Sequence, residues 1–408
     1  MNVLYLSYDG VLDPLGQTQI LPYLRGLAHQ YGHRFVLVSY EKPHVWHDSI
    51  RRQAVSKQLL AEGITWLPLK YHKWPSVLAT LFDVARGIAH CTTIIKRFKI
   101  QAVHSRSYVP MLIALPLKYW FGLPLVFDMR GLWADERADV GACTRASRQY
   151  RAIKALERAS LRHSDHIITL TQCSLPALHA MSVGQKHPHP ITVIPCCTDT
   201  HRWRRDEQAR QHVRHKHGWE HATVLVYSGS LGGWYRTADL ARLFATWQQH
   251  DSATRLLVLA NNTASALIAA LTAEGVAPIN YTIKHVQASD VPMWLSAADA
   301  GLSLVTPSYS KIATSPTKYA EYLACGLPII ANKAIGDTAI LFDQWHVGIH
   351  VHDFTPSAYS QAWHDYMVLR QDPTLSQRCR AIATQQFDLQ RAVQSYYHIY
   401  QALEKHNL

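Results

Sequence analysis

Short apolar runs alternate with longer amphipathic stretches along the whole chain. The apolar runs are rich in Val, Ile and Leu, as buried strands are, and the longer stretches repeat their apolar positions at helical spacing. This alternation predicts parallel sheets that are covered by helices on both faces. We expect a first series of strands at residues 2–7, 34–39, 64–68, 102–105, 125–128, 166–169 and 191–194. We expect a second series at residues 223–227, 255–259, 281–284, 300–304, 329–331 and 347–350.

A basic and poorly apolar stretch at residues 201–217 separates the two series. The chain has 408 residues and 48% hydrophobic content, enough for two cores, because domains usually contain about 100 to 200 residues. We therefore predict an α/β protein with two doubly wound, Rossmann-like domains at residues 1–200 and 201–387. In such domains the ligand crevice lies at the carboxyl ends of the strands, and we expect the two crevice edges to face each other.

Polar residues directly follow the predicted strands in both domains. In the first domain they include His104, Arg106, Asp128 and Arg130. In the second domain they fall at residues 229–234, 261–262 and 307–318. Residues at these positions are expected to line the crevice. Two interpretations of His104 stay open, namely a group on the ligand side and a buried side chain that only satisfies the backbone.

The stretch KIATSPTKYAEYLACGLPII, at residues 311–330, predicts an anion site at the start of a helix. Ser315 is a favoured N-cap and the proline after it a favoured first helical residue, so the amides of Thr317 and Lys318 are expected to point out of the helix. Lys318 and Glu321 share one face, which pairs a cation for a diphosphate with a carboxylate for a ribose diol. The alternative is an ordinary capped helix with a surface ion pair.

This segment resembles the donor-binding element of the retaining glycosyltransferases of family 4, in the variant form Ser-Pro-x-Lys-x-x-Glu-Tyr-Leu-Ala-x-Gly-x-Pro. The resemblance implies the GT-B fold, with Glu321 at the position that holds the nucleotide ribose. Many members carry a second glutamate eight residues earlier, where it contacts the transferred sugar, but this chain has Ala313 there. The resemblance therefore leaves sugar recognition to other groups, such as Lys311, Thr314 or Ser315.

The resemblance covers nearly the whole chain. NVLYLSYDGVLDPLGQ looks like the first strand and loop of the family, with Gly16 where backbone passes close to ligand. VLVYSGSLGGWYR looks like the first strand and glycine loop of the second half, beginning at Gly229. Usual members have an arginine and a lysine in this loop, where this chain has Ser230 and Tyr235. The cations left to bind a diphosphate are, in our order of preference, Lys318, Lys311 and Arg236, which follows Tyr235.

The resemblance also implies a function. We expect a retaining hexosyltransferase that moves a sugar from a nucleoside-diphosphate sugar to a glycan or lipid-linked acceptor, in bacterial-type surface polysaccharide or glycoconjugate synthesis. The C-terminal helix at residues 388–408 is expected to join the first domain, which would bind the acceptor. Arg130 stands where many members have a histidine, and we expect it to orient acceptor or sugar, because a guanidinium does not act as a base near neutral pH. A nucleotide-sugar epimerase of the same fold is the alternative.

Three groups of residues follow as site predictions. The catalytic candidates are Arg130, Lys318 and Lys311. The donor-binding candidates are Gly16, Gly229, Ser230, Arg236, Ser315, Thr317, Lys318 and Glu321. The acceptor-side candidates are His104, Arg106, Asp128 and Arg130. No Asp-x-Asp motif or His-Cys cluster is present, so we expect neither a metal nor another cofactor.

The net charge of +12 suggests an anionic partner, although no nucleic-acid recognition motif is present and we expect no nucleic acid. A predicted helix at residues 145–162 carries Arg148, Arg151, Lys154, Arg158 and Arg162 on one side. Three interpretations stay open for this side: a solvated face, a surface that binds acidic lipid, and a binding site for a lipid-linked phosphate acceptor. The basic and aromatic run at residues 69–74 is a second candidate for an acceptor or membrane surface.

Seven cysteines in no metal or disulfide spacing, and an N-terminus that begins directly with a strand pattern, favour a cytoplasmic protein without a secretory signal. The apolar stretch at residues 109–127 contains two prolines and a glycine. A helix, a turn and a strand explain it better than a membrane span, which needs about 20 unbroken apolar residues. We therefore expect a soluble protein, or one peripheral on the inner face of the membrane.

Overall fold

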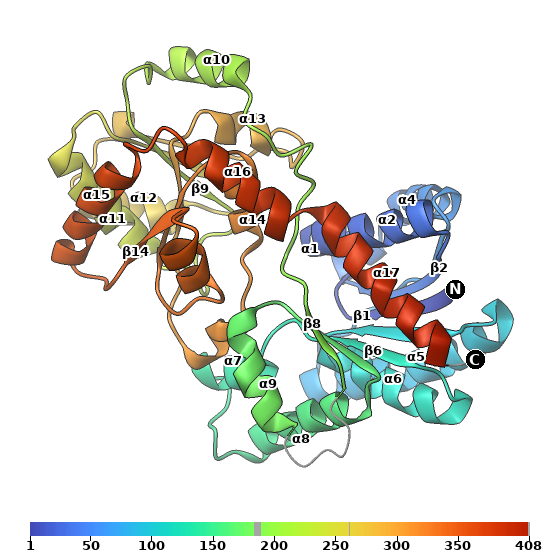
Figure 1. Cartoon of the computed structure of the whole chain (residues 1–408). Helices are drawn as coiled ribbons and strands as arrows, with labels where there is room; N and C mark the ends of the chain where they lie inside the picture. The colour runs from blue at the N-terminus through green and yellow to red at the C-terminus, as the bar shows by residue number, and fades with distance from the viewer. Residues whose placement is uncertain (183–188, 261, 407–408) are drawn as a thin grey trace. The chain divides into compact units, whose positions relative to one another are not determined.

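The computed structural model describes residues 1–182, 189–260 and 262–406, and its chain divides into two compact units (Figure 1). The first unit contains Met1–Pro195, Tyr309–Thr314 and Leu389–Leu408. The second unit contains Cys196–Ser308 and Ser315–Asp388. The chain therefore enters the first unit three times, and the last of these entries is the C-terminal helix.

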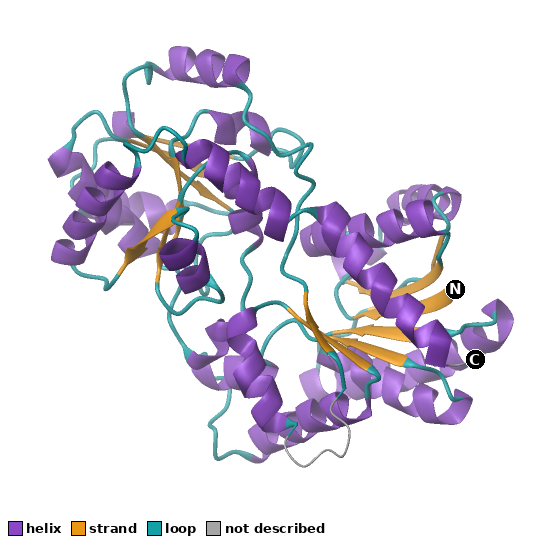
Figure 2. Ribbon diagram, in the orientation of Figure 1, coloured by secondary structure: helices purple, strands orange, loops and turns teal. Residues whose placement is uncertain are grey.

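The first unit is built on a parallel sheet in the order β3-β2-β1-β5-β6-β7-β8, with the short β4 paired to β2 (Figure 2). The strands are β1 (Asn2–Ser7), β2 (Arg34–Glu41), β3 (Ile64–Trp66), β4 (Leu69–Lys70), β5 (Ala102–Arg106), β6 (Leu125–Asp128), β7 (His166–Thr169) and β8 (Ile191–Val193). The helices are α1 (Pro14–Gln19), α2 (Leu21–Tyr31), α3 (Pro43–Trp46), α4 (Ser49–Ala61), α5 (Ser76–Phe98), α6 (Tyr108–Phe121), α7 (Trp133–Asp139), α8 (Arg148–His163), α9 (Leu175–Met181) and α17 (Leu389–His406). Two 3-10 turns, η1 (Gln172–Ser174) and η3 (Tyr309–Ala313), complete this unit.

The second unit is built on a parallel sheet in the order β11-β10-β9-β12-β13-β14. The strands are β9 (Val224–Ser228), β10 (Arg255–Leu259), β11 (Tyr281–Lys284), β12 (Ala300–Ser303), β13 (Ile329–Asn332) and β14 (Gly348–Val351). The helices are α10 (Glu207–His217), α11 (Thr237–His250), α12 (Ser265–Ala273), α13 (Val291–Ser296), α14 (Thr317–Ala324), α15 (Pro356–Leu369) and α16 (Leu375–Gln386). Both sheets are parallel with helical connections, which confirms the predicted doubly wound architecture.

Each sheet reverses its strand order beside its first strand. In the first unit the reversal falls between β1 and β5, and in the second it falls between β9 and β12. Ligands of doubly wound sheets bind beyond the carboxyl ends of the strands at such a reversal. The topology of each unit thus marks one place for a ligand, independently of any motif.

The predicted strands occur with local differences. The strand expected at 64–68 is divided into β3 and β4, because Pro68 between them has no amide to donate to a ladder. The stretch at 201–217, predicted only as a separator, contains the helix α10. The Asp206 carboxylate caps that helix by accepting from the amide of Ala209 at 3.0 Å.

The apolar stretch at 109–127 forms nearly all of α6, then a turn and most of β6, as predicted. Gly122 ends α6 in a left-handed conformation with φ of 64°, which glycine adopts without steric cost. Among the described residues, one helix, α5, is long and apolar enough to cross a membrane, and 39% of its most apolar stretch is buried inside the protein. Core helices of soluble proteins meet the same criterion, so this is weak evidence for a span.

Candidate functional site

The Lys318 ammonium lies at the topological reversal of the second unit. Its side chain is only 5% exposed, and Nζ has no hydrogen-bond partner in the parts of the chain that the structure describes. Nζ lies 3.9 Å from the ring centre of Tyr227 and 4.1 Å from that of Tyr235. Aromatic faces attract cations but provide no acceptor. Burial lowers the pKa of Lys318 to about 7, against the opposing effect of the Glu321 carboxylate.

The glycine loop after β9 holds this aromatic support in place. Tyr235 forms an isolated antiparallel bridge with Val305, which follows β12, so the loop is fixed across the reversal between β9 and β12. Gly229 has a φ of 124°, and a Cβ added there would lie 3.3 Å from Lys318 Nζ. A glycine at this position therefore allows the close approach of the ammonium to the loop. The structure thus brings together Gly229 and Lys318, two of the predicted donor-binding residues.

The helix start differs from the prediction by one residue. Helix α14 begins at Thr317 with Pro316 as its N-cap, so Ser315 is not the cap. The Ser315 hydroxyl instead accepts a hydrogen bond from the amide of Cys196 at 3.1 Å. The amides of Thr317 and Lys318 still occupy the first helical positions, where a helix offers them no acceptor of its own. Ser315 therefore does not cap the helix. The first turn of α14 still has free amides that can bind an anion.

Glu321 follows Lys318 on the same helix and is partly exposed. Loss of surrounding water raises the pKa of this carboxyl to about 7, with the Lys318 charge opposing the rise. No ion pair within 4 Å joins the two side chains among the described residues. The alternative of an ordinary surface ion pair is therefore wrong for these residues. The helix instead presents a carboxyl and an ammonium side by side, both titrating near neutrality.

Two other residues that were predicted to bind the nucleotide-sugar donor have contacts within the protein. Arg236 pairs with Asp239 at 2.6 Å and lies over the ring of Phe354 at 3.9 Å, so its charge is already neutralised. Arg236 was ranked last of the three candidate cations for a diphosphate, and that role stays a prediction. Ser230 is exposed, and its carbonyl accepts a hydrogen bond from the Tyr227 hydroxyl. Asn261, expected in the same loop region, lies outside the described residues.

Lys311 and Ala313 belong to the first unit, whereas Lys318 belongs to the second. Lys311 is 3% exposed, and its Nζ lies 3.1 Å from Glu136 of α7. Ala313 is 1% exposed and belongs to the apolar core cluster of the first unit. A glutamate at that position would have to bury its charge in this core, so the structure explains why alanine is accommodated there.

In the first unit, Asp128 lies at the end of β6 and is fully buried. Its Oδ2 is 3.2 Å from Arg106 Nη1, and its Oδ1 is 3.3 Å from Arg130 Nη1. Burial alone would raise the pKa of Asp128, but the Arg130 and Arg106 guanidiniums and His104 outweigh it and hold this pKa well below its ordinary value. Asp128 is therefore an ionised carboxylate that positions Arg130, which is partly exposed at the strand end.

His104 and Arg106 are buried, with 0% and 2% exposure. The His104 ring contacts the Tyr400 hydroxyl of α17 at 2.7 Å through Nδ1 and stacks on Tyr5, and burial lowers its pKa. These positions correct the expectation that His104 and Arg106 meet an acceptor directly. His104 is buried, as in the second of the two interpretations, but its ring contacts the side chains of Tyr400 and Asp128 instead of the backbone.

Gly16 lies inside the short helix α1. A Cβ there would lie 2.3 Å from the carbonyl oxygen of Gly10 and 2.7 Å from Cα of Val11. The space beside this glycine is occupied by the backbone of the protein's own loop. Loop packing therefore requires a glycine at this position, and the approach of a ligand to its backbone stays a prediction.

Sequence reasoning missed the two tyrosines that hold the Lys318 ammonium. Tyr235 was noted only as a replacement for a cation, and Tyr227 was taken as an ordinary strand residue. The signal that points to both is a pair of aromatic residues flanking a glycine loop beside a helix that carries a buried lysine. Among the described residues, no group of three or more His, Cys, Asp or Glu side chains is placed to hold a metal ion.

Comparisons with known proteins agree with this geometry. Residues 16–197 match the family model described as a glycosyl transferase 4-like domain, a range that ends where the first unit passes into the second. No curated protein sequence matches the chain.

Solved structures show the same fold over the full length. Sucrose-phosphate synthase from Thermosynechococcus elongatus is similar with a TM-score of 0.75 and 14% identity, covering 99% of each chain. A glycosyltransferase from Rickettsia africae has a TM-score of 0.74 and 13% identity, covering 99% of this chain and 98% of its own. HepE from Anabaena, solved in complex with UDP, has a TM-score of 0.73 and 15% identity, covering 98% of this chain and 100% of its own. The fold of this protein is GT-B.

Proposed function

We propose that this protein is a retaining, metal-independent glycosyltransferase that moves a hexose from a nucleoside-diphosphate sugar to a glycan or lipid-linked acceptor. The observation that carries the proposal is the buried Lys318 ammonium, which has no hydrogen-bond partner within the described parts of the chain and belongs to the first turn of α14. A diphosphate supplies the acceptors that this ammonium and these amides lack. Anabaena HepE, which has also been solved with UDP-glucose, supports a nucleotide-sugar donor.

The proposed reaction breaks the bond between the anomeric carbon and the diphosphate oxygen, and the electron pair leaves with the phosphate. The acceptor hydroxyl forms its bond to the same face of the sugar and passes its proton to the departing phosphate oxygen. Lys318 and the amides of Thr317 and Lys318 stabilise the charge that develops on this oxygen. No separate protein base is required. Glu321 accepts hydrogen bonds from the ribose diol in this proposal.

On the acceptor side, we propose that Arg130 orients the acceptor or the sugar. Asp128 fixes the guanidinium through its contact at 3.3 Å, and the buried His104 and Arg106 hold Asp128 in turn. The acceptor pathway, bacterial-type surface polysaccharide or glycoconjugate synthesis, is part of the proposal. We also propose a cytoplasmic location, where nucleotide sugars are available as donors.

Binding of nucleoside diphosphates, measured by thermal shift, tests the donor site. We expect UDP to raise the melting temperature of the full chain, because a ligand that binds only the folded state stabilises it. Lys318→Met is expected to remove the shift, and Lys333→Met, which changes an exposed lysine of the same unit, is the matched control. Equal shifts in both variants would refute the role of Lys318. Transfer that is lost in excess chelator and restored by magnesium would refute metal independence.

We also propose that the protein associates with the surface of an anionic bilayer. Five large apolar side chains are exposed around the start of α5, ranging from 55% for Leu81 to 85% for Trp74; they are Trp74, Val77, Leu78, Leu81 and Phe82. Lys70 and Lys73 lie beside them in sequence, and a mixture of exposed aromatic and basic groups favours the interface of an acidic membrane. Of the basic side chains expected on α8, Lys154 is held in ion pairs and is not available to lipid.

Sedimentation with phosphatidylcholine vesicles containing phosphatidylserine tests this surface. We expect the double variant Trp74→Ser/Phe82→Ser to lose binding. Ile279→Ser/Val368→Ser removes two apolar side chains of similar exposure from the second unit and serves as the control. Sedimentation of the first variant at the level of the control would overturn the membrane proposal without touching the donor site.

A further inference from the structure

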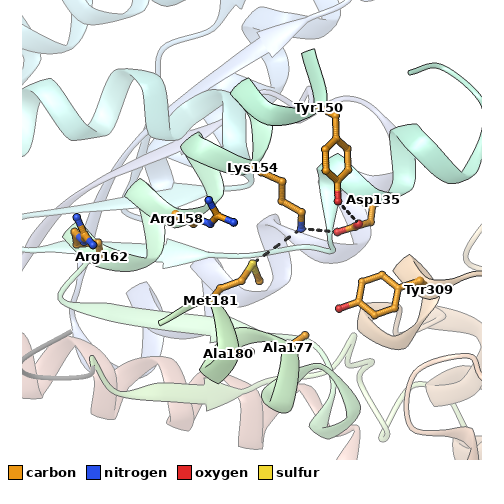
Figure 3. Close-up of a pocket in the computed structure, with 9 residues that line it drawn as sticks. All are labelled: Asp135, Tyr150, Lys154, Arg158, Arg162, Ala177, Ala180, Met181 and Tyr309. Carbon is orange, nitrogen blue, oxygen red and sulfur yellow. Dashed lines mark hydrogen bonds and ion pairs between the residues drawn. The ribbon is translucent and has the colours of Figure 1, made fainter. Parts of the chain in front are cut away.

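A pocket of about 460 Å³ lies between α8 and α9 in the first unit (Figure 3). It is separate from the Asp128 cluster and belongs to none of the predicted site groups. Lys154, Arg158 and Arg162 reach it from α8, where their spacing of four residues places them on one face of the helix. Asp135 of α7 contributes a carboxylate. The charged side chains that line the pocket therefore comprise three cations and one anion.

The three cations differ in how they are paired. Lys154 Nζ lies 2.5 Å from Asp135 Oδ2 and 2.7 Å from Glu157 Oε2, and although burial opposes it, these carboxylates raise the pKa of Lys154. In contrast, Arg158 and Arg162 are exposed and have no ion pair or side-chain hydrogen bond among the described residues. The positive charge that the pocket offers to a ligand thus comes from these two guanidiniums, one helical turn apart.

The other end of the pocket is aromatic and apolar. Tyr150, whose hydroxyl donates to Asp135 Oδ1 at 2.8 Å, and Tyr309 of η3 lie at the end opposite Arg162 (Figure 3). Met181 of α9 lies between the two ends, and its Sδ is 4.0 Å from Lys154 Nζ. Aromatic rings bind the apolar faces of sugars or carbon chains, whereas guanidiniums bind phosphate oxygens. The pocket therefore suits a ligand with a phosphate at one end and a less polar group at the other.

We propose that this pocket binds the phosphate or diphosphate group of the acceptor substrate, with Arg158 and Arg162 as its ligands. The proposal rests on the proposed function, since it assigns a place to the acceptor of the same enzyme. It also distinguishes between two sets of arginines on α8. Arg148 and Arg151 are exposed on the same helix but do not line the pocket, so they belong to an ordinary solvated face.

The methyl group of Met181 provides a local readout. The chain has six methionines, and labelling their methyl groups with carbon-13 lets the full-length protein be titrated with inorganic pyrophosphate by NMR. Met181→Leu assigns the signal, and the other methionines serve as references. We expect the Met181 signal to shift with pyrophosphate, and Arg158→Ala/Arg162→Ala to weaken that response about tenfold or more, because hydrogen bonds to charged groups contribute about 1.5–3 kcal/mol.

The matched control is Arg148→Ala/Arg151→Ala, which removes the same net charge from the same helix. The pocket proposal is overturned if Met181 does not respond, or if the two double variants weaken the response equally. UDP binding measured on the same samples separates the two hypotheses. A Met181 response without UDP binding refutes the donor site but not the anion pocket, whereas UDP binding without a Met181 response refutes the pocket alone.

A second measurement identifies the source of the phosphate. Phosphatidylcholine vesicles with and without phosphatidic acid present the group on a lipid, whereas pyrophosphate presents it in solution. If Arg158→Ala/Arg162→Ala lowers sedimentation with the phosphatidic acid vesicles more than the control does, the pocket takes a lipid-borne phosphate. If only the pyrophosphate response depends on the two arginines, the pocket takes a soluble phosphorylated acceptor. This measurement decides only the source of the phosphate, and the Met181 response to pyrophosphate decides whether the pocket binds phosphate at all.

Discussion

Tyr235 presents its ring to the ammonium of Lys318, with Nζ 4.1 Å from the ring centre. In the usual pattern of the family that this chain resembles, a lysine occupies the position of Tyr235. Here an aromatic face replaces that lysine and helps to bury the ammonium of Lys318, which belongs to α14 and not to the loop. The loop therefore carries no positive charge at the position of Tyr235. This relationship leads to the first two predictions.

Replacing Lys318 by methionine is expected to stabilise the free protein while removing nucleotide binding. The folded state lowers the pKa of Lys318 from 10.5 to about 7, so between these pH values the unfolded chain binds more protons and stability rises with pH. Methionine does not titrate, so the free energy of unfolding of the variant should lack this dependence on pH. At pH 7 we expect a gain in the free energy of unfolding of about 1 kcal/mol or more, since an apolar isostere avoids the desolvation of a charge. Denaturant unfolding at pH 7 and pH 9 measures both effects, and a less stable variant at pH 7 would contradict the prediction.

Nucleotide affinity is expected to fall as pH rises through about 7. The proposed diphosphate contact needs the protonated Lys318, and the pKa of about 7 means that this form is lost above neutrality in the free protein. The arginine of the Lys318→Arg variant stays charged near neutral pH, so the affinity of this variant for the nucleotide should change little with pH. Calorimetric titration with UDP at pH 6, 7 and 8 checks this, and parallel pH profiles for the two proteins would refute it.

Introducing the glutamate of the usual family pattern, Ala313→Glu, is expected to destabilise the protein instead of changing the choice of sugar. Ala313 is 1% exposed in the apolar core of the first unit, so the variant must bury a carboxylate without a partner. We expect a loss of about 2–4 kcal/mol in the free energy of unfolding. Thr314→Glu, at the partly exposed neighbour, is the control and should cost less than about 1 kcal/mol. A stable Ala313→Glu protein with altered donor preference would show that the prediction is wrong.

Replacing Asp128 by asparagine is expected to destabilise the protein near neutrality by about 3 kcal/mol, because Arg106 is left buried without its carboxylate. Asp128 has a pKa below its ordinary 3.8 in the folded state, so its stabilising effect is present above that pH and is lost as pH falls below it. The difference in the free energy of unfolding between the wild type and the variant should therefore become smaller at acid pH. Urea unfolding at pH 7 and pH 3 tests this, and a constant difference would contradict the expected ionisation of Asp128.

Local patterns predicted most of the fold because each of them is read from neighbouring residues. The strands from Asn2 to Ser7 and from Val224 to Ser228 were expected at these places from their apolar runs alone. The start of α14 was expected one residue too early, because serine and proline in succession favour a cap. The tertiary contact of Ser315 with the amide of Cys196 prevailed over that local preference.

Side-chain roles were less predictable than elements. The sequence offered both Lys318 and Arg236 as cations for a diphosphate, with Lys318 preferred. The structure shows that Arg236 pairs with Asp239, whereas the Lys318 ammonium has no hydrogen-bond partner among the described residues. Likewise, the helical spacing of the basic residues in the sequence predicted that they lie along one side of α8. Nothing in its spacing revealed that Lys154 is neutralised by Asp135, whereas Arg158 and Arg162 face a pocket.

The amino-acid sequence by itself determined the two doubly wound sheets and the helix that carries Lys318 and Glu321, because strand runs, helical spacing and glycine positions act over a few neighbouring residues. Only the tertiary structure decided which charged side chains form ion pairs inside the protein and which remain available to a ligand. Burial and pairing depend on residues far apart in the chain, such as Tyr227 with Lys318 and Ala313 with the core of the first unit, and no local pattern contains that information.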